Sequence, residues 1–227
     1  MGKLYWVTSL DGEENRSCAA RIYRDIFKEK ENVIFLSAEE IRQTHRDPFD
    51  EELTEEAWKQ SAQRDMMMIR YLTDQEIDVV YCSSCEFHEV REWARNHIPD
   101  MEFVTGENVD SSSEATTLPK RSPGTMYWIT GLSGAGKTTI GTIFFQMLRE
   151  RKKNVILMDG DAFRDSMDSK RDYSKEARRK LCYRNAPLIK LLSLLGLDIV
   201  NCTIAMFEDV RKWSKKNWRV SKTPKST

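Results

Sequence analysis

The chain contains 227 residues with a mass of 26.5 kDa, which is enough for one large domain or two small ones. Its composition, 40% hydrophobic and 32% charged, is typical of a soluble globular protein. The net charge is zero, but residues 1–110 hold 13 Lys and Arg against 25 Asp and Glu, whereas residues 111–227 hold 23 against 11. The basic half suits an anionic ligand and the acidic half does not, although the two halves could also simply attract each other.

The sequence argues against secretion, a membrane partner and a nucleic-acid partner. The N-terminal residues MGKLYWVT lack the apolar core of a signal peptide. The most apolar run, residues 188–204, is interrupted by Lys190, Asp198 and Asn201, so we expect a helix end followed by a buried strand. The basic residues lack interleaved aromatic side chains, which argues against nucleic-acid binding. Five cysteines, an odd number, favour reduced thiols and a cytoplasmic location.

In chain order, the first half alternates predicted strands and helices. Residues 5–20 (YWVTSLDGEENRSCAA) predict a short apolar strand, a turn and a helix, which is the outline of a phosphate-binding loop. The runs NVIFLS and DVVYCS predict two further strands with a charged helical stretch between them, and another helix follows. Residues 101–105 (MEFVT) predict a fourth strand. Strands that alternate with helices indicate a parallel sheet covered on both faces.

The second half repeats the first with a shift of 122 residues and, after a two-residue gap, with a shift of 120. The longest matching stretches are ENVIFLSAEEIR (31–42) with KNVILMDGDAFR (153–164), and IDVVYCSSCEFHEVREW (77–93) with LDIVNCTIAMFEDVRKW (197–213). So many ordered matches, aromatic residues included, indicate a tandem duplication.

A stretch rich in Ser, Thr and Pro, residues 106–125, separates the two copies and has the composition of a linker. We therefore predict two tandem α/β units of the P-loop NTPase type, each a three-layer unit with a parallel sheet. Their predicted bounds are residues 1–107 and 125–227, with the linker at 108–124. The second copy ends in WRVSKTPKST, where neither a fourth strand nor a lid can be recognised, so we expect a truncated second unit.

Residues 131–138 (GLSGAGKT) satisfy the pattern G-x-x-x-x-G-K-[ST] between a predicted strand and a predicted helix. Glycines allow the backbone to wrap closely around a phosphate chain with its N–H groups pointing inward, and the following helix adds its positive end. Lys137 is expected to reach the β- and γ-phosphates, and the Thr138 hydroxyl to ligate Mg²⁺. We therefore predict an ATP site formed by Gly131, Leu132, Ser133, Gly134, Ala135, Gly136, Lys137, Thr138 and Thr139.

The first copy has lost the chemistry of this loop. Where the second copy has Gly131, Gly136, Lys137 and Thr138, the first has Ser9, Glu14, Asn15 and Arg16. Glu13 and Glu14 would stand where phosphate oxygens should lie, and like charges about 4 Å apart repel by ~4 kcal/mol at an effective dielectric constant of about 20. We predict that the first copy keeps the fold without a functional phosphate loop.

An acidic stretch, MDGDAFR (158–164), follows the second strand of the second copy. Carboxylates beside a phosphate loop can hold Mg²⁺-bound water or accept a proton from an attacking hydroxyl. In order and spacing, GLSGAGKTT, LMDGDAFR, YSKEARRK and CTIAMFEDVRKWSKKN resemble the adenylylsulfate (APS) kinases. The resemblance covers residues 126–218 and, more faintly, residues 4–106. It implies ATP- and Mg²⁺-dependent transfer of the γ-phosphate to the 3′-hydroxyl of adenylylsulfate, a step of sulfate activation.

Carried over position by position, the resemblance implies roles for individual residues. Lys137 and Asp161 would be catalytic, and Thr138 and Asp159 would hold Mg²⁺. The residues implied to contact the adenylylsulfate substrate are Arg164, Tyr173, Arg178 and Ile204. APS kinases commonly pair as homodimers, which implies either a homodimer or an intramolecular pseudo-dimer of the acidic and the basic copy.

Departures from the family pattern leave the substrate open. Leu181 stands where the family usually has an Asn that contacts substrate. Ala205 replaces a serine that some members carry, which favours direct in-line transfer without a covalent intermediate. A kinase of the same family acting on another nucleotide-linked molecule is the first alternative. An ATP-binding protein without catalysis is the second, because a missing lid would admit water and remove charged groups around the phosphoryl group.

Overall fold

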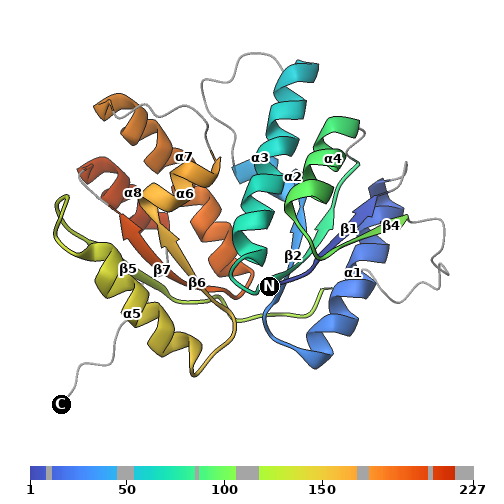
Figure 1. The fold of residues 1–227 in the computed structure, drawn as a ribbon, viewed down its shortest axis with the longest axis horizontal. Helices are drawn as coiled ribbons and strands as arrows, with labels where there is room; N and C mark the ends of the chain where they lie inside the picture. The colour runs from blue at the N-terminus through green and yellow to red at the C-terminus, as the bar shows by residue number, and fades with distance from the viewer. Residues whose placement is uncertain are drawn as a thin grey trace.

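The computed structural model describes residues 1–8, 12–44, 54–84, 87–105, 118–167, 174–203 and 207–217. These residues form two separate parallel sheets with helices packed around them (Figure 1). This is the α/β class that the alternation of predicted strands and helices indicated. Most of the predicted linker, residues 108–117, lies outside the described residues, and residues 118–125 lead into the second sheet.

The first sheet has four parallel strands in the order β2-β3-β1-β4. They are β1 (Leu4–Thr8), β2 (Val33–Ser37), β3 (Asp78–Cys82) and β4 (Met101–Thr105). β2 and β3 are buried along their whole length, as apolar strands are in a parallel sheet that is covered on both faces. The predicted fourth strand is confirmed as β4, which pairs with β1 from Leu4↔Met101 to Thr8↔Thr105.

The helices of the first unit are α1 (Gly12–Glu29), α2 (Ala38–Thr44), α3 (Glu55–Thr73) and α4 (His88–His97). α1 covers one face of the sheet, where its Ala19 and Tyr23 pack with Phe35 and Val80. α3 and α4 contribute to a second apolar cluster on the other face. α3 begins after Thr54, whose side chain accepts a hydrogen bond from the backbone N–H of Ala57 and so satisfies one free donor of the first turn.

The second sheet has three parallel strands among the described residues, in the order β5-β7-β6. They are β5 (Met126–Thr130), β6 (Val155–Asp159) and β7 (Asp198–Thr203). The helices of this unit are α5 (Lys137–Arg149), α6 (Gly160–Met167), α7 (Lys175–Leu194) and α8 (Glu208–Asn217). The expectation of a truncated unit depends on residues 218–227, which lie outside the described part of the chain.

The apolar run at 188–204 is divided between the end of α7 and β7, as its polar interruptions predicted. Asp198 and Asn201 are both buried in β7. Within the described ranges, no helix is long and apolar enough to cross a membrane.

The two sheets are anchored in the same way at positions related by the shifts of 122 and 120 residues. Asp78 Oδ1 accepts a hydrogen bond from the backbone N–H of Lys3 at 2.9 Å, and Asp198 Oδ1 accepts one from the backbone N–H of Thr125 at 2.6 Å. Both aspartates are buried. Each also forms an ion pair with a lysine that follows the first helix of its unit: Lys30 with Asp78 and Lys152 with Asp198. The repeated residues therefore make repeated contacts.

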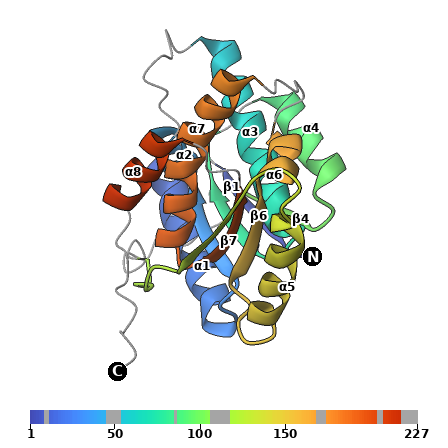
Figure 2. The ribbon, with the colours of Figure 1, turned by 90° about the vertical axis from the view of Figure 1, so that its left-hand side faces the viewer.

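The units pack through helices that lie between the sheets. α3 of the first unit contacts α6 of the second, and α7 of the second contacts α2 of the first (Figure 2). In the sequence repeat α3 corresponds to α7 and α2 to α6, so the same type of contact is made twice. One apolar cluster joins the facing sides of the two sheets, and it includes Trp6 and Ile34 from the first unit and Ile156 and Ile199 from the second.

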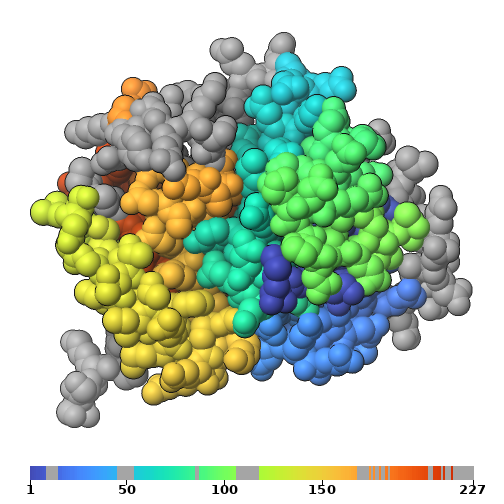
Figure 3. Space-filling view, viewed as in Figure 1, coloured from blue at the N-terminus to red at the C-terminus, as the bar shows by residue number. Residues whose placement is uncertain are grey.

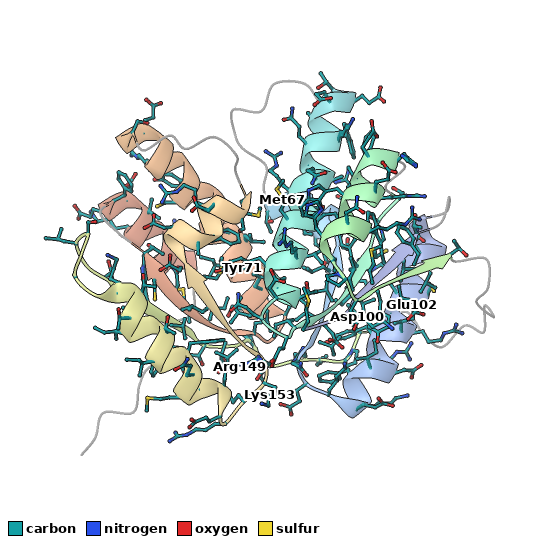
Figure 4. The ribbon with its side chains drawn as sticks, viewed as in Figure 1. Met67, Tyr71, Asp100, Glu102, Arg149 and Lys153 are labelled. Carbon is teal, nitrogen blue, oxygen red and sulfur yellow. The ribbon has the colours of Figure 1, made fainter. Side chains whose placement is uncertain are left out.

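Tyr71 on α3 lies at the junction of the two units (Figure 4). Its hydroxyl donates to the carbonyl of Leu157 on β6 at 3.0 Å, and its ring meets the ring of Phe163 edge-on at 5.1 Å. Burial raises the pKa of Tyr71 to about 12. Arg149 on α5 pairs with Glu76 nearby. In the space-filling view, α3 lies directly beside α6 across the middle of this face (Figure 3).

Candidate active site

The predicted phosphate loop connects β5 to α5, as the sequence pattern requires. Gly134 and Gly136 have φ angles of 77° and 75°, in the left-handed region that glycine adopts without the steric cost of a Cβ atom. Gly136 is the residue that caps the N-terminus of α5. The loop is exposed, with Leu132 at 72%. Its conformation depends on glycine rather than on packing.

Gly141 sets how closely α5 approaches the sheet. It is buried one turn after the loop, and a Cβ atom at this position would overlap the sulfur of Cys202 on β7. Cys202 in turn places its Sγ 3.6 Å from the backbone oxygen of Lys137. Burial raises the pKa of this thiol, so it packs as an uncharged group under the start of the helix.

The side chains of Lys137 and Thr138, at the start of α5, form hydrogen bonds with different partners. Lys137 Nζ donates to the carbonyl of Leu132 at 2.7 Å, so its ammonium group lies across the phosphate loop. The Thr138 hydroxyl donates to Asp159 Oδ2 at 2.6 Å, which links the loop to the end of β6. The lysine and threonine of the motif are therefore adjacent to the acidic stretch that the sequence singled out.

Asp159 also begins the next helix. Its Oδ1 accepts hydrogen bonds from the backbone N–H groups of Asp161 and Ala162, both at 3.1 Å, which caps α6. With Oδ2 bound to Thr138, both carboxylate oxygens are engaged. Asp159 thus holds the phosphate loop and α6 at one edge of the sheet.

Asp161 and Arg164 form an ion pair on the first turn of α6. The Asp161 side chain is 80% exposed, whereas that of Arg164 is 12% exposed. The first unit contains the same arrangement at the corresponding positions, because Arg42 pairs with Glu39 on α2. The pairing is therefore a property of this helix in both units, and it leaves the Asp161 carboxylate at the surface beside the loop.

The structure brings together most of the site residues that the sequence predicted. The residues of the loop and α5 (131–139) lie beside Asp159 at the end of β6, and α6 carries Asp161 and Arg164 next to it. Tyr173 and Ile204 lie outside the described residues, and only the backbone of Arg178 on α7 is described. Glu13 and Glu14 of the first copy fall at the start of α1 without described side chains, so their predicted effect stays a prediction.

The donor set suits Mg²⁺. Thr138 and Asp159 offer hard oxygen donors, and Mg²⁺ is usually bound by one or two protein oxygens together with substrate phosphates and water. A complete protein cage is absent from the described part of the chain, where no cluster of three His, Cys, Asp or Glu side chains occurs. The residues present therefore fit a magnesium ion that reaches the site with a nucleotide.

Sequence reasoning missed a polar cluster between α7 and α8. Arg179 Nε donates to Asp209 Oδ2 at 3.0 Å, and the Tyr183 hydroxyl donates to the same oxygen at 2.6 Å. These hydrogen bonds, first from Tyr183 and then from Arg179, lower the pKa of Asp209 to about 2. In the sequence, Arg179 is one of a run of charges, and such a run usually forms a solvated helix face. Its partner lies 30 residues further along the chain, so only the folded structure reveals it.

A parallel sheet whose strand β5 leads through a glycine-lysine-threonine loop into α5 defines the second unit as a P-loop fold. A family model described as adenylylsulphate kinase matches residues 123–223. The resemblance to APS kinases is thus confirmed for this part of the chain.

Curated relatives carry more than one activity in their names. The chain is 36% identical over 104 residues to the adenylyl-sulfate kinase of Pseudomonas aeruginosa. The aligned region covers 46% of this chain and 53% of that protein. It is 34% identical over 89 residues to the cytidine diphosphoramidate kinase of Campylobacter jejuni. The aligned region covers 39% of this chain and 52% of that protein. The chain spans about half the length of these curated relatives.

Solved structures of APS kinases also resemble the chain. One from Mycobacterium tuberculosis matches 42% of this chain and 67% of its own length, with 24% identity and a TM-score of 0.38. A hexameric APS kinase from Thiobacillus denitrificans matches 94% of this chain and 57% of its own, with 14% identity and a TM-score of 0.38.

Proposed function

We propose that the second unit is an ATP- and Mg²⁺-dependent kinase that phosphorylates the 3′-hydroxyl of adenylylsulfate. The observation that carries the proposal is the link between Thr138 and Asp159, which places the phosphate loop directly beside the acidic end of β6. A phosphoryl-transfer site needs these two parts together, because the loop holds the phosphates and the acidic end supplies metal and proton partners.

Each part of the proposed site would have a separate role in phosphoryl transfer. The loop N–H groups and the N-terminus of α5 would hold the phosphate chain, and the Lys137 ammonium, which lies across the loop, would move from the Leu132 carbonyl to phosphate oxygens. Thr138 and Asp159 would hold Mg²⁺, which when bound neutralises charge on the β- and γ-phosphates. Asp161 would accept the proton from the attacking hydroxyl of the substrate.

Binding of the acceptor substrate would break the ion pair between Asp161 and Arg164. An anionic group of the acceptor would compete for Arg164, and the Asp161 carboxylate would then be free to face the hydroxyl. Arg164 is the less exposed of the two, and a partly buried guanidinium attracts an anionic group more strongly than one in water.

A second acceptor is favoured by two observations. One curated relative is named a cytidine diphosphoramidate kinase, and Leu181 replaces the Asn that APS kinases usually use to contact substrate. Both point to another nucleotide-linked acceptor, with the same phosphate loop and the same transfer. An ATP-binding protein without catalysis is the third candidate, and tight ATP binding without transfer to any acceptor would favour it.

We also propose that the first unit is a degenerate copy that acts as a built-in partner for the second. The repeated aspartate anchors support a tandem duplication with units at 1–107 and 125–227 joined by a linker at 108–124. The paired contacts of α3 with α6 and of α7 with α2 support a pseudo-dimer. Expression of residues 120–227 alone should give an unstable fragment, because the shared apolar cluster would be exposed. A soluble fragment as stable as the whole chain would contradict the pairing.

The kinase proposal is tested by measuring ADP release from the full chain with ATP and Mg²⁺. Adenylylsulfate, cytidine diphosphoramidate and no acceptor form the three arms, and we expect release with adenylylsulfate. Asp161→Asn should lower turnover by at least about 100-fold, since it removes the proton acceptor. Glu39→Gln, the matching change in the first unit, should leave turnover unchanged. Release that is independent of the acceptor, or untouched by Asp161→Asn, would overturn the proposal.

A further inference from the structure

The outer edge of β6, the strand that ends at Asp159, is held by side chains of the first unit. β6 lies at the edge of the second sheet among the described strands, so its outward-facing backbone groups need partners of another kind. The Leu157 N–H donates to Gln75 Oε1 at 2.7 Å, and the Leu157 carbonyl accepts from the Tyr71 hydroxyl at 3.0 Å. Two side chains from the first unit therefore take the place of a neighbouring strand.

Tyr71 connects this contact to the acidic end of β6. Burial raises the pKa of Tyr71 to about 12, and a hydrogen bond with the backbone of Asp159 opposes that rise, so the hydroxyl lies against the residue that accepts from Thr138. The Tyr71 ring also meets the buried ring of Phe163 on α6. Tyr71 therefore contacts both β6 and α6, the two elements that carry Asp159 and Asp161 (Figure 4).

The turn that follows α3 supports this contact and adds another. Gln75 Nε2 donates to the backbone carbonyl of Tyr71 at 3.3 Å, which fixes the amide with its oxygen toward β6. Glu76 has a φ angle of 61°, in the left-handed region that is sterically unfavourable for a residue with a Cβ atom. Its carboxylate pairs with Arg149 at the end of α5. The turn therefore keeps a strained backbone at a residue whose side chain contacts the second unit.

The corresponding turn of the second unit lacks these polar side chains. At the three matching positions of the sequence repeat it has Leu191, Leu195 and Gly196. The two leucine side chains have no hydrogen-bonding group, and Gly196 adopts its φ angle of 88° without the steric cost of a Cβ atom. In this turn, polar side chains therefore reach from the unit without a phosphate loop to the unit that has one, and not in the opposite direction.

We propose that Tyr71, Gln75 and Glu76 are positioning residues that hold the acidic end of β6 in place for metal binding in the second unit. The inference rests on the kinase function proposed above. The Asp159 carboxylate must lie beside Thr138 to share a metal ion with it, and a displacement of about 1 Å in such a site costs about 100-fold in rate. The loop holds phosphates through its own N–H groups, so the three residues should affect only the metal-dependent part of nucleotide binding.

The test is calorimetric titration of the full chain with ADP, with and without Mg²⁺, so it can be read without turnover. The ratio of the two affinities is the Mg²⁺ enhancement. Tyr71→Phe keeps the ring on Phe163 but removes the hydroxyl, and it should lower the enhancement by about tenfold while the affinity without Mg²⁺ stays the same. Tyr81→Phe is the matched control, because it removes another buried hydroxyl of the first unit, which donates to Asp65 at 2.8 Å. It should leave the enhancement unchanged.

A double-mutant cycle distinguishes positioning from a merely structural role. Asp159→Asn should lower the Mg²⁺ enhancement by itself, because it removes a charged oxygen donor. If Tyr71 acts through Asp159, Tyr71→Phe should cause no further loss in the Asp159→Asn variant. Gln75→Leu, which removes the acceptor for the Leu157 N–H, should reproduce the effect of Tyr71→Phe.

The outcomes separate this inference from the kinase proposal. An enhancement that Tyr71→Phe leaves unchanged, an equal loss in Tyr81→Phe, or a further loss in the Asp159→Asn background would overturn the positioning role alone. A natural chain that binds no ADP, or binds it equally with and without Mg²⁺, would overturn the kinase proposal together with the positioning role.

Discussion

The two units of this chain have the same strand order for three strands but differ in what surrounds those strands. β1 is flanked by β4, whereas no described strand pairs with the outer edge of β5. The outer helices differ as well, because Ile143 and Met147 on α5 are each 54% exposed where α1 has Arg21 and Asp25. The residues that build the sheets are repeated, whereas residues on the outer helices differ between the units.

The comparison of the two units distinguishes residues that stabilise the sheets from residues of the phosphate loop. The buried aspartates Asp78 and Asp198 make equivalent hydrogen bonds although one unit keeps a phosphate loop and the other does not. The helix that follows the second strand begins with a side-chain cap in both units, at Ser37 and at Asp159. The anchors of the two parallel sheets therefore do not depend on a phosphate loop.

The largest expected effect tests the divergence of the two loops. Lys137→Ala should lower the rate of phosphoryl transfer by about 10³-fold, because it removes the cation aimed at the transferring phosphate. Asn15→Ala, the matched change in the first unit, should leave the rate unchanged. Both rates are measured by ADP release from the full chain. Equal losses in the two variants would mean that the loops do not differ in function.

The next effect concerns Asp65, which occupies the position of Asn185 in the second unit. Burial raises its pKa to about 7, above the value of about 3.9 in an unfolded chain. The folded state therefore binds the proton more tightly, and the free energy of unfolding falls as the pH rises from about 4 to about 7. Asp65→Asn should remove this component, worth about 3 to 4 kcal/mol, because an amide does not titrate and can still accept from Tyr81.

The measurement is urea unfolding of the natural chain and the Asp65→Asn variant at several pH values between 4 and 8. The difference between the two free energies of unfolding should grow in favour of the variant up to about pH 7 and then stay constant. A difference that does not change with pH would show that the Asp65 carboxyl titrates normally in the folded chain.

Matched changes at the two anchors sharpen the comparison of the sheets. Asp78→Asn and Asp198→Asn should each lower the free energy of unfolding by about 2 to 3 kcal/mol, since the neutral amide can still accept the backbone hydrogen bond but no longer pairs with the charge of Lys30 or Lys152. Urea unfolding of the two variants measures both. A loss confined to one variant would mean that the equivalent contacts do not contribute equally in the two units.

The smallest effect concerns the approach of α5 to its sheet. Gly141→Ala should destabilise the chain by about 1 to 2 kcal/mol, because the added methyl group overlaps the Cys202 sulfur. The first unit has Ala19 and Cys82 at these positions, so its helix accommodates the methyl group. The double variant Gly141→Ala with Cys202→Ala should recover most of the loss in thermal unfolding. Failure of this recovery would point to the helix itself and not to the sulfur contact.

The sequence alone determined the α/β class, the phosphate loop and the position of β4. Each of these depends on local properties: apolar strand runs, glycines at positions with positive φ, and a lysine-threonine pair at a helix start. The matching stretches of the two halves could also be read directly from the sequence.

Only the tertiary structure decided which side chains meet. The bond from Thr138 to Asp159 spans 21 residues, and that from Tyr71 to Leu157 spans 86. The surroundings of Asp65 come from two helices, a strand and the loop that follows it. Contacts of this kind depend on how whole elements pack, and a carboxyl group such as that of Asp65 changes its pKa only because that packing removes water. Residue types and spacing therefore predict the phosphate loop. The side-chain contacts between elements that are distant in the sequence form only when the chain is folded.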